Sequence, residues 1–258
     1  MKPLPYAVDR NILIEADRET VFSFFTDNAR WATWWGAGST VDARPGGALR
    51  IQHSNGFVSE GEVIEVAPPE RFVFTYSLQS TRPVPAEESR VTIRLEEQTD
   101  GTMLMLTHEV SDAVTRDLLV QGWRFQFSLF ANAVANYVNA GAPDVVDAWF
   151  ALWAEPDAQA REAALGRIAA RKVRFRDRYS RVDGIDEIVA HTGASQKFMP
   201  GVRLERQGDI RHCQGTVLAE WVARSSDGKT VMSGTNVFVL GPGLKIDSVT
   251  GVPSAATS

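Results

Sequence analysis

Residues 29–36 read ARWATWWG and hold three of the chain's seven tryptophans, Trp31, Trp34 and Trp35. Their offsets of three and four positions predict that the three rings share one face of a short helix. The preceding segment RETVFSFFT (18–26) predicts another helix with an aromatic face. Taken alone, the tryptophans are either a platform for a ligand or a thick piece of core.

The chain around these helices predicts an antiparallel sheet. The segment DRNILIEA (9–16) alternates as a strand does, and the turn DARPGG (42–47) is followed by segments of period two. Short stretches rich in serine, asparagine, glycine and proline separate these segments, as turns separate strands. The predicted strands after the turn are 48–53, 57–66, 70–78, 89–97 and 102–110.

A long helix follows the predicted sheet. Ser111 and Asp112 open it, and its apolar positions step by three or four residues along one face. The segment NAGAP (139–143) ends it and marks the predicted boundary between two domains, 1–140 and 144–252. The apolar face consists of Leu119, Trp123, Phe127, Phe130, Val134 and Tyr137.

The second half repeats nothing from the first, but it again combines helices with strands. Helices are predicted over 145–155 and over 184–198. Between them, Pro156 and Asp157 end the first helix and cap another that runs through Ala169. We therefore expect both halves to be α+β, each with a mostly antiparallel sheet that wraps helices. The predicted strands of this half are 172–180, 202–211, 213–224, 230–241 and 243–252.

Composition argues against several classes of partner. A net charge of −5 disfavours nucleic acid and anionic membranes, because both require a basic face. No apolar run is long enough to span a bilayer, and the N-terminal segment does not resemble a signal peptide. Cys213 is the single cysteine, and no Cys/His cluster has metal-ligand spacing. We therefore expect a cytoplasmic protein without a metal or other cofactor.

Positions 8–140 resemble the SRPBCC superfamily, and within it the subgroup named after the Hsp90 ATPase activator homologues. The matching segments are VFSFFTDNARWATWW (21–35), DARPGGALR (42–50), EGEVIEVAPPERFVFTY (60–76), TMLMLTHE (102–109) and QGWRFQFSLFANAVANY (121–137). The resemblance implies an N-terminal helix-grip (START or Bet v 1-like) domain. It does not imply one activity, since the superfamily includes binders, cyclases and proteins without a known task. Co-chaperone activity is not expected, because the co-chaperone's own charged binding segment has no match here.

Positions 144–252 resemble the NTF2-like superfamily, in its SnoaL-like or ketosteroid-isomerase-like branch. The resemblance implies a cone-shaped α+β barrel around a cavity. It also implies a homodimer, because such cones commonly pair through the convex face of the sheet. The matching features are Trp149, VRFRD (173–177), DGIDEIVAH (183–191), MPG (199–201), AEWVARSSDG (219–228), SGTNVFVL (233–240) and KIDSVTG (245–251).

The ketosteroid-isomerase pattern implies a carboxylate base and two hydrogen-bond donors for a developing oxyanion. Carried onto this chain, the base is Asp177, while Trp149 and Asn236 stand where the family has a tyrosine and a protonated aspartate. Both can still donate a hydrogen bond, so Asp177 and Asn236 are the candidate catalytic residues. The competing interpretation is structural: Arg176 and Arg178 flank Asp177, which suits a surface ion pair or a turn cap.

The candidate ligand-binding residues face the two predicted interiors. Their composition fits a cavity lining and a filled core equally well, so both interpretations stay open. His212 lies on the opposite face of its strand, where a structural or interface role is favoured. The candidates are Trp34, Trp35, Phe74, Tyr76, His108, Trp123 and Phe127 in the first domain, and Trp149, Phe175, Trp221 and Phe238 in the second.

These observations favour a two-domain protein that binds a small hydrophobic or aromatic molecule in an internal cavity, with little or no catalysis. One alternative is a polyketide-cyclase-like or ketosteroid-isomerase-like enzyme that uses Asp177 as its base. The other is a regulatory or stress-related interaction module whose cavities are closed by side chains.

Overall fold

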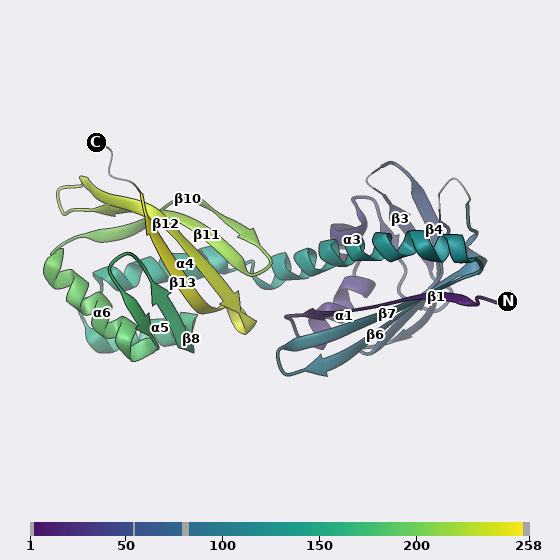
Figure 1. Cartoon of the computed structure of the whole chain (residues 1–258), viewed down its shortest axis with the longest axis horizontal. Coiled ribbons are helices and arrows are strands. Elements are labelled where there is room, and N and C mark those ends of the chain that lie inside the picture. The colour runs from purple at the N-terminus through teal and green to yellow at the C-terminus, as the bar shows by residue number, and fades with distance from the viewer. Residues whose placement is uncertain (1–2, 54, 79–82, 255–258) are drawn as a thin grey trace. The chain divides into compact units, whose positions relative to one another are not determined.

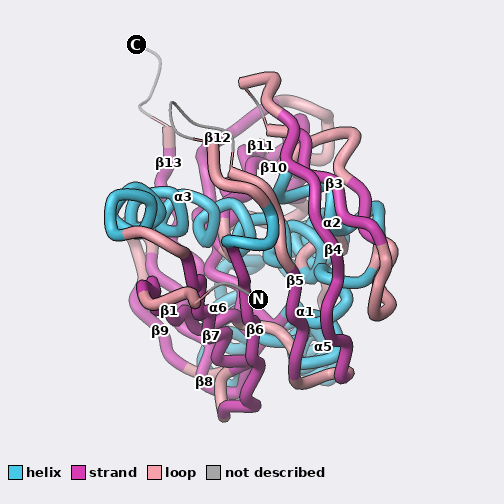
Figure 2. Tube along the Cα trace, turned by 90° about the vertical axis from the view of Figure 1, so that its right-hand side faces the viewer, coloured by secondary structure: helices cyan, strands magenta, loops and turns pink. Residues whose placement is uncertain are grey.

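A computed structural model describes residues 3–53, 55–78 and 83–254 of the chain. The chain divides into two compact units, Met1–Ala135 and Asn136–Ser258. Each unit combines helices with a largely antiparallel sheet (Figures 1 and 2), which confirms the predicted α+β class. No helix in the described ranges is long and apolar enough to cross a lipid bilayer.

The first unit is built on a sheet whose described strands lie in the order β1-β7-β6-β5-β4-β3-β2. All five strands predicted after the turn are present, and β2 adds a short edge strand to them. The strands are β1 (Tyr6–Ile14), β2 (Thr40–Val41), β3 (Ala48–Gln52), β4 (Val58–Ala67), β5 (Arg71–Phe74), β6 (Ser89–Gln98) and β7 (Gly101–Val110).

Helices α1 (Arg18–Thr26), α2 (Asn28–Trp35) and α3 (Ala113–Val138) belong with this sheet, together with a 3₁₀ turn at Ala86–Glu88. Asp17 caps α1 by accepting from the Thr20 amide, which satisfies one of the free donors at a helix start. On the apolar face predicted for α3, Trp123, Phe127, Phe130 and Val134 are buried, whereas Tyr137 is 48 % exposed. Tyr137 lies past the end of the first unit, which is Ala135.

The core of the first unit is aromatic and joins all three helices to the sheet. The Phe25 ring of α1 stacks on Phe130 of α3 at a centroid distance of 5.1 Å. It also meets Trp34 of α2 at 5.7 Å and Phe72 of β5 at 6.0 Å. Offset and edge-to-face contacts of this kind add to the stabilisation from burial alone.

A buried hydrogen-bonded chain crosses the same core. The indole Nε1 of Trp123 donates to His108 Nδ1 at 2.9 Å, and His108 Nε2 lies 2.8 Å from Ser89 Oγ. Because an indole N–H only donates, Nδ1 is the acceptor and the proton of the neutral imidazole sits on Nε2. His108 therefore donates to Ser89 and does not act as a base that activates the serine hydroxyl.

The second unit has described strands in the order β10-β11-β12-β13-β8-β9, with β13 and β8 parallel. The predicted strand 172–180 is replaced by two strands and a turn that begins at Asp177. The strands are β8 (Ala169–Arg176), β9 (Arg181–Asp183), β10 (Arg203–Cys213), β11 (Thr216–Arg224), β12 (Thr230–Gly241) and β13 (Lys245–Pro253). The helices are α4 (Ala142–Ala151), α5 (Ala158–Ile168) and α6 (Ile185–Phe198), with 3₁₀ turns at Leu152–Ala154 and Pro242–Leu244.

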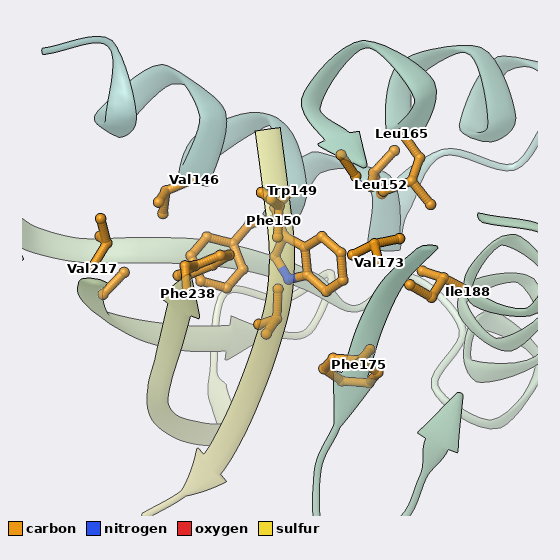
Figure 3. Packing of buried hydrophobic residues seen from close by; sticks show 14 of the residues in the cluster. Val146, Trp149, Phe150, Leu152, Leu165, Val173, Phe175, Ile188, Val217 and Phe238 are labelled. Atoms are coloured by element: carbon orange, nitrogen blue, oxygen red, sulfur yellow. The ribbon is translucent and has the colours of Figure 1, made fainter. Parts of the chain in front are cut away.

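Trp149 of α4 lies at the centre of the second core and is fully buried. Figure 3 shows its indole between Phe238 of β12 and Val173 of β8, with Phe175 close by. The ring centroid of Trp149 lies 6.1 Å from that of Phe238 and 5.5 Å from that of Phe175. The helices of this unit are therefore held to the inner face of the sheet by ring packing.

The buried histidine predicts a pH dependence of stability. Burial lowers the pKa of His108 from 6.5 to about 3. Between these values the unfolded chain takes up a proton at this residue and the folded chain does not. The free energy of unfolding should therefore fall as the pH drops from 6.5 toward 3, by up to about 1.4 kcal/mol per pH unit from this group.

Urea denaturation at a series of pH values measures this slope for the wild type and for His108→Gln. The variant should lose stability more gradually over the same range, whatever its stability at neutral pH. Equal slopes for the two proteins would contradict a neutral, buried His108.

Candidate functional site

Four residues on neighbouring strands of the second unit form a row, which we call the inner row: Trp221, Asn236, Gly251 and Asp177. Asn236 of β12 pairs in register with Gly251 of β13, and β13 runs beside β8, which Asp177 follows. A Cβ atom at Gly251 would lie 3.1 Å from Asn236 Oδ1 and 3.3 Å from Asp177 Cβ. Even a methyl group would be crowded there, so the glycine lets the two candidate catalytic side chains approach this position closely.

The Asn236 side chain is buried and has a defined orientation. Its Oδ1 accepts a hydrogen bond from Trp221 Nε1 at 2.9 Å. Because the indole can only donate, the oxygen must face Trp221 and the amide nitrogen must face the other way. Asn236 thus keeps an N–H₂ group that can donate to a further acceptor.

Asp177 caps the turn between β8 and β9. Its Oδ1 accepts from the Tyr179 amide at 2.8 Å and from Ser180 Oγ at 2.6 Å. The neighbouring Arg176 pairs with Asp183 and not with Asp177. Asp177 therefore does cap the turn, but only through Oδ1. Its second carboxylate oxygen, Oδ2, takes no part in the two hydrogen bonds of the turn.

An aromatic wall stands beside the inner row and consists of Trp149, Trp153, Phe175 and His191. The Phe175 ring lies 5.5 Å from Trp149, 5.6 Å from Trp153 and 5.7 Å from His191. Trp153 Nε1 and Trp149 Nε1 are both buried, and within the described chain neither nitrogen has a hydrogen-bond partner. Two donors thus remain available in this wall.

Sequence reasoning did not include Trp153 or His191 among the candidates. Trp153 follows Trp149 by four residues, and His191 follows the buried Ile188 by three. Helical spacing therefore carried a signal for both positions. The candidates Phe238 and Trp221 lie in the same core, in contact with Trp149 and Asn236 respectively.

The seven candidate ligand-binding residues of the first unit form one continuous cluster. Each is at most 7 % exposed. Neighbouring ring centroids are 4.5–6.0 Å apart, a spacing typical of rings in contact. The contacts run from Trp34 to Trp35, Trp35 to Tyr76, Phe74 to Tyr76, Tyr76 to His108, His108 to Trp123 and Trp123 to Phe127.

Most polar atoms of this cluster are paired within the protein. Trp34 Nε1 donates to the Phe24 carbonyl at 3.1 Å, whereas the buried Trp35 Nε1 has no partner in the described chain. Burial raises the pKa of the Tyr76 hydroxyl, so this group stays neutral. His53 lies beside Trp35, and partial burial lowers its pKa. The cluster is therefore a neutral, closely packed interior.

His212 has a structural role. Its Nε2 accepts from the Gly215 amide at 3.1 Å, so the proton sits on Nδ1, which donates to Asn136 Oδ1 at 2.9 Å. Both ring nitrogens are therefore occupied, one by the β10–β11 turn and the other by Asn136 at the end of α3.

A cleft of about 700 Å³ lies between α5, α6 and the β8–β9 pair, away from all the predicted site residues. Glu162, Asp183, Asp186 and Glu187 make its lining acidic, with Arg171 as the opposing charge. Such a lining does not suit an apolar ligand. Among the described residues, no group of three or more His, Cys, Asp or Glu side chains is placed to hold a metal ion.

Comparison with solved structures finds similar folds for parts of the chain. A protein of the SnoaL-like family from Agrobacterium tumefaciens str. C58 is 27 % identical over 43 % of this chain and 96 % of its own, with a TM-score of 0.42. The Aha1 dimer from Colwellia psychrerythraea is 15 % identical over 50 % of this chain and 96 % of its own, with a TM-score of 0.44. Protein MLL2253 from Mesorhizobium loti is 20 % identical over 50 % and 96 %, with a TM-score of 0.44.

No curated protein matches the sequence. A family model does match part of it, that of the Activator of Hsp90 ATPase homolog 1-like proteins, over residues 15–135. The match covers strands β2 to β7, helices α1 and α2 and most of α3, and it begins just after β1. Residues 15–135 therefore carry an Activator of Hsp90 ATPase homolog 1-like domain of the SRPBCC superfamily.

Proposed function

We propose that the unit Asn136–Ser258 binds a small, mostly apolar molecule that carries a hydrogen-bond-accepting oxygen, such as an aromatic ketone. The binding site is the space between the inner row and the aromatic wall. The observation that carries this proposal is the fully buried indole N–H of Trp149, which has no partner within the described chain.

An unpaired buried donor is unfavourable for the folded protein. Leaving such a group without a partner costs about 1–3 kcal/mol, and buried polar groups in native proteins are nearly always paired. Trp149 and Trp153 both carry such a donor and both contact Phe175. A ligand oxygen that reached either nitrogen would recover this energy, while the ring of Phe175 would contact the apolar body of the ligand.

The rings of the aromatic wall touch one another, so a ligand must separate them in order to enter. This opening reduces the observed affinity by the fraction of time that the unit spends in the open form. We therefore expect modest affinity and slow association.

The first unit supports the same proposal less strongly. Among the described residues of its cluster, the indole nitrogen of Trp35 has no partner, while Trp123 donates to His108 and Trp34 donates to a backbone carbonyl. A ligand-binding role for this cluster, and a homodimer formed through the sheet of the second unit, stay predictions.

A second candidate function is proton transfer by Asp177, and one observation favours it. Asp177 and Asn236 lie on opposite sides of a single position, Gly251, and close to each other. A ketone whose oxygen accepted a hydrogen bond from the Asn236 amide nitrogen could bring an adjacent C–H to the carboxylate of Asp177. That arrangement suits a base that removes the proton while the oxygen becomes an enolate.

The unpaired donor predicts different effects for two tryptophan substitutions. Trp149→Phe removes a donor that has no partner, whereas Trp221→Phe leaves the buried Asn236 Oδ1 without its donor. Both changes remove a similar ring volume from a buried site. The Trp221 variant should therefore lose about 1–3 kcal/mol more stability than the Trp149 variant in urea denaturation. Equal losses would indicate that Trp149 Nε1 is hydrogen-bonded in solution.

A matched pair of ligands tests binding directly. 1-Tetralone and tetralin have the same ring system, and the ketone alone carries an acceptor oxygen. Calorimetric titration of the full chain should show binding of the ketone that is roughly tenfold or more tighter, as expected for one hydrogen bond to a buried donor. Trp149→Phe should abolish the preference, and Trp31→Phe in the other unit should retain it. Absence of binding by both compounds would favour closed cavities and a role as an interaction module.

Catalysis by Asp177 is tested by hydrogen exchange on the same ketone. In D₂O, a base that removes the proton next to the carbonyl returns a deuteron, which nuclear magnetic resonance detects at that carbon. Asp177→Asn keeps the oxygen that caps the turn but loses the base. The variant should abolish exchange and leave ketone affinity nearly unchanged. If the wild-type chain binds the ketone without accelerating exchange, the unit is a binder and not a proton-transfer enzyme.

A further inference from the structure

Helix α3 has a second apolar face that points away from the core of its unit. We call it the outer stripe, and it consists of Val114, Leu118, Phe125 and Leu129. These side chains are 61 %, 63 %, 64 % and 37 % exposed. Offsets of four and seven residues align them along one side of the helix, opposite the buried Trp123 and Phe127. An aligned apolar stripe of this kind is typical of a surface that contacts another protein.

The outer stripe is symmetric about its own midpoint, which lies between Gln121 and Gly122. Leu118 and Phe125 each lie three positions outside this central pair, and Val114 and Leu129 each lie seven positions outside it. Two such helices that run antiparallel therefore match residue for residue. Leu118 meets Phe125 of the second copy, and Val114 meets its Leu129. A two-fold axis produces this self-complementary arrangement.

The centre of the outer stripe allows a close approach. Apart from the adjacent residues and backbone of α3 itself, a Cβ atom at Gly122 would meet no atom of the described chain within 4 Å, so this position opens onto the surface. Glycine in the middle of a helix is unfavourable by about 0.5–1 kcal/mol relative to alanine. A second helix can pack closely against the backbone at Gly122, because no side chain is in the way. This close packing would offset the cost of placing a glycine in the helix.

Charges on one flank of the outer stripe complete the match. Asp117 and Arg124 are seven residues apart and therefore lie on the same side of the helix. In the antiparallel pair, this flank of one copy lies beside the same flank of the other. Asp117 of each copy then lies about two residues, or about 3 Å along the helix axis, from Arg124 of its partner, within reach of an ion pair. Asp117 has 69 % of its side chain exposed and an ion pair with Arg116, which leaves its outer edge accessible.

We propose that the outer stripe of α3 binds the outer stripe of a second copy of this chain, antiparallel and across a two-fold axis at Gln121–Gly122. At 1.5 Å per residue, the contact is about 22 Å long. A single helix pair of this length buries less than the roughly 800 Å² per partner of a standard interface. The dimer is therefore a weak one that forms in the micromolar range, and its exposed ion pairs set orientation more than affinity.

Sedimentation velocity of the full chain over a concentration series measures this association. Phe125→Glu places a charge in the outer stripe and should weaken self-association by roughly tenfold or more, because two carboxylates would meet apolar side chains of the partner. The matched control is Phe198→Glu, which alters a phenylalanine that is 86 % exposed on α6 of the other unit. The control should retain the wild-type dimer.

Charge exchange tests the register and the antiparallel direction. Asp117→Arg puts four positive charges at the interface, Arg124→Asp puts four negative charges there, and each variant alone should be monomeric. An equal mixture of the two variants should form a heterodimer, because every facing pair is then of opposite sign. The double variant D117R/R124D should also dimerise. These are surface substitutions that keep the inner face of α3 intact, and circular dichroism checks that each variant is folded.

Three outcomes would overturn the proposal. The wild-type chain could stay monomeric up to hundreds of micromolar, in which case the other unit or a different protein covers the outer stripe. The dimer could survive Phe125→Glu and be lost in Phe198→Glu, which would place the interface on the other unit. The mixed charge variants could fail to associate, which would exclude the antiparallel register.

Discussion

An indole N–H donates a hydrogen bond and cannot accept one, and this constraint fixes much of the polar chemistry in the protein. Where a tryptophan has a buried partner, that partner must present an acceptor. Trp123 therefore determines the tautomer of His108, and Trp221 determines which way Asn236 faces. In the first unit, this arrangement removes His108 as a base for Ser89. In the second unit, it leaves the Asn236 amide free to donate.

The same constraint separates the two interiors as ligand sites. Within the described chain, Trp35, Trp149 and Trp153 have buried indole nitrogens without partners. Two of these three tryptophans pack against one phenylalanine in the second unit, and Asp177 and Asn236 lie beside Gly251 in the same unit. A neutral molecule with one acceptor oxygen satisfies donors at that place more readily than in the first unit, where ring contacts and internal bonds already fill the core.

Sequence periodicity predicted the helices and strands of both units, because burial on one face imposes a period of two or 3.6 residues. It also predicted that the three tryptophans of ARWATWWG share one face of a helix, and all three are buried on α2. It could not predict which indole nitrogens are paired, since that depends on partners such as Asn236 that lie on other strands. The turn at Asp177 was misassigned to a strand because an aspartate carboxylate can cap its own turn and end a strand within two residues.

The outer stripe of α3 was also not identified from the sequence, because only one apolar face was assigned to this helix. A helix that packs on a core usually has a polar outer side, and the buried rings of α3 already account for its contacts with the sheet. Phe125 and Leu118 on the outside are therefore surplus to the fold of the first unit. A group of exposed apolar side chains outside the core promotes non-specific association unless another surface binds to it. The symmetry of the outer stripe makes a second copy of the same helix the cover with the best geometric match.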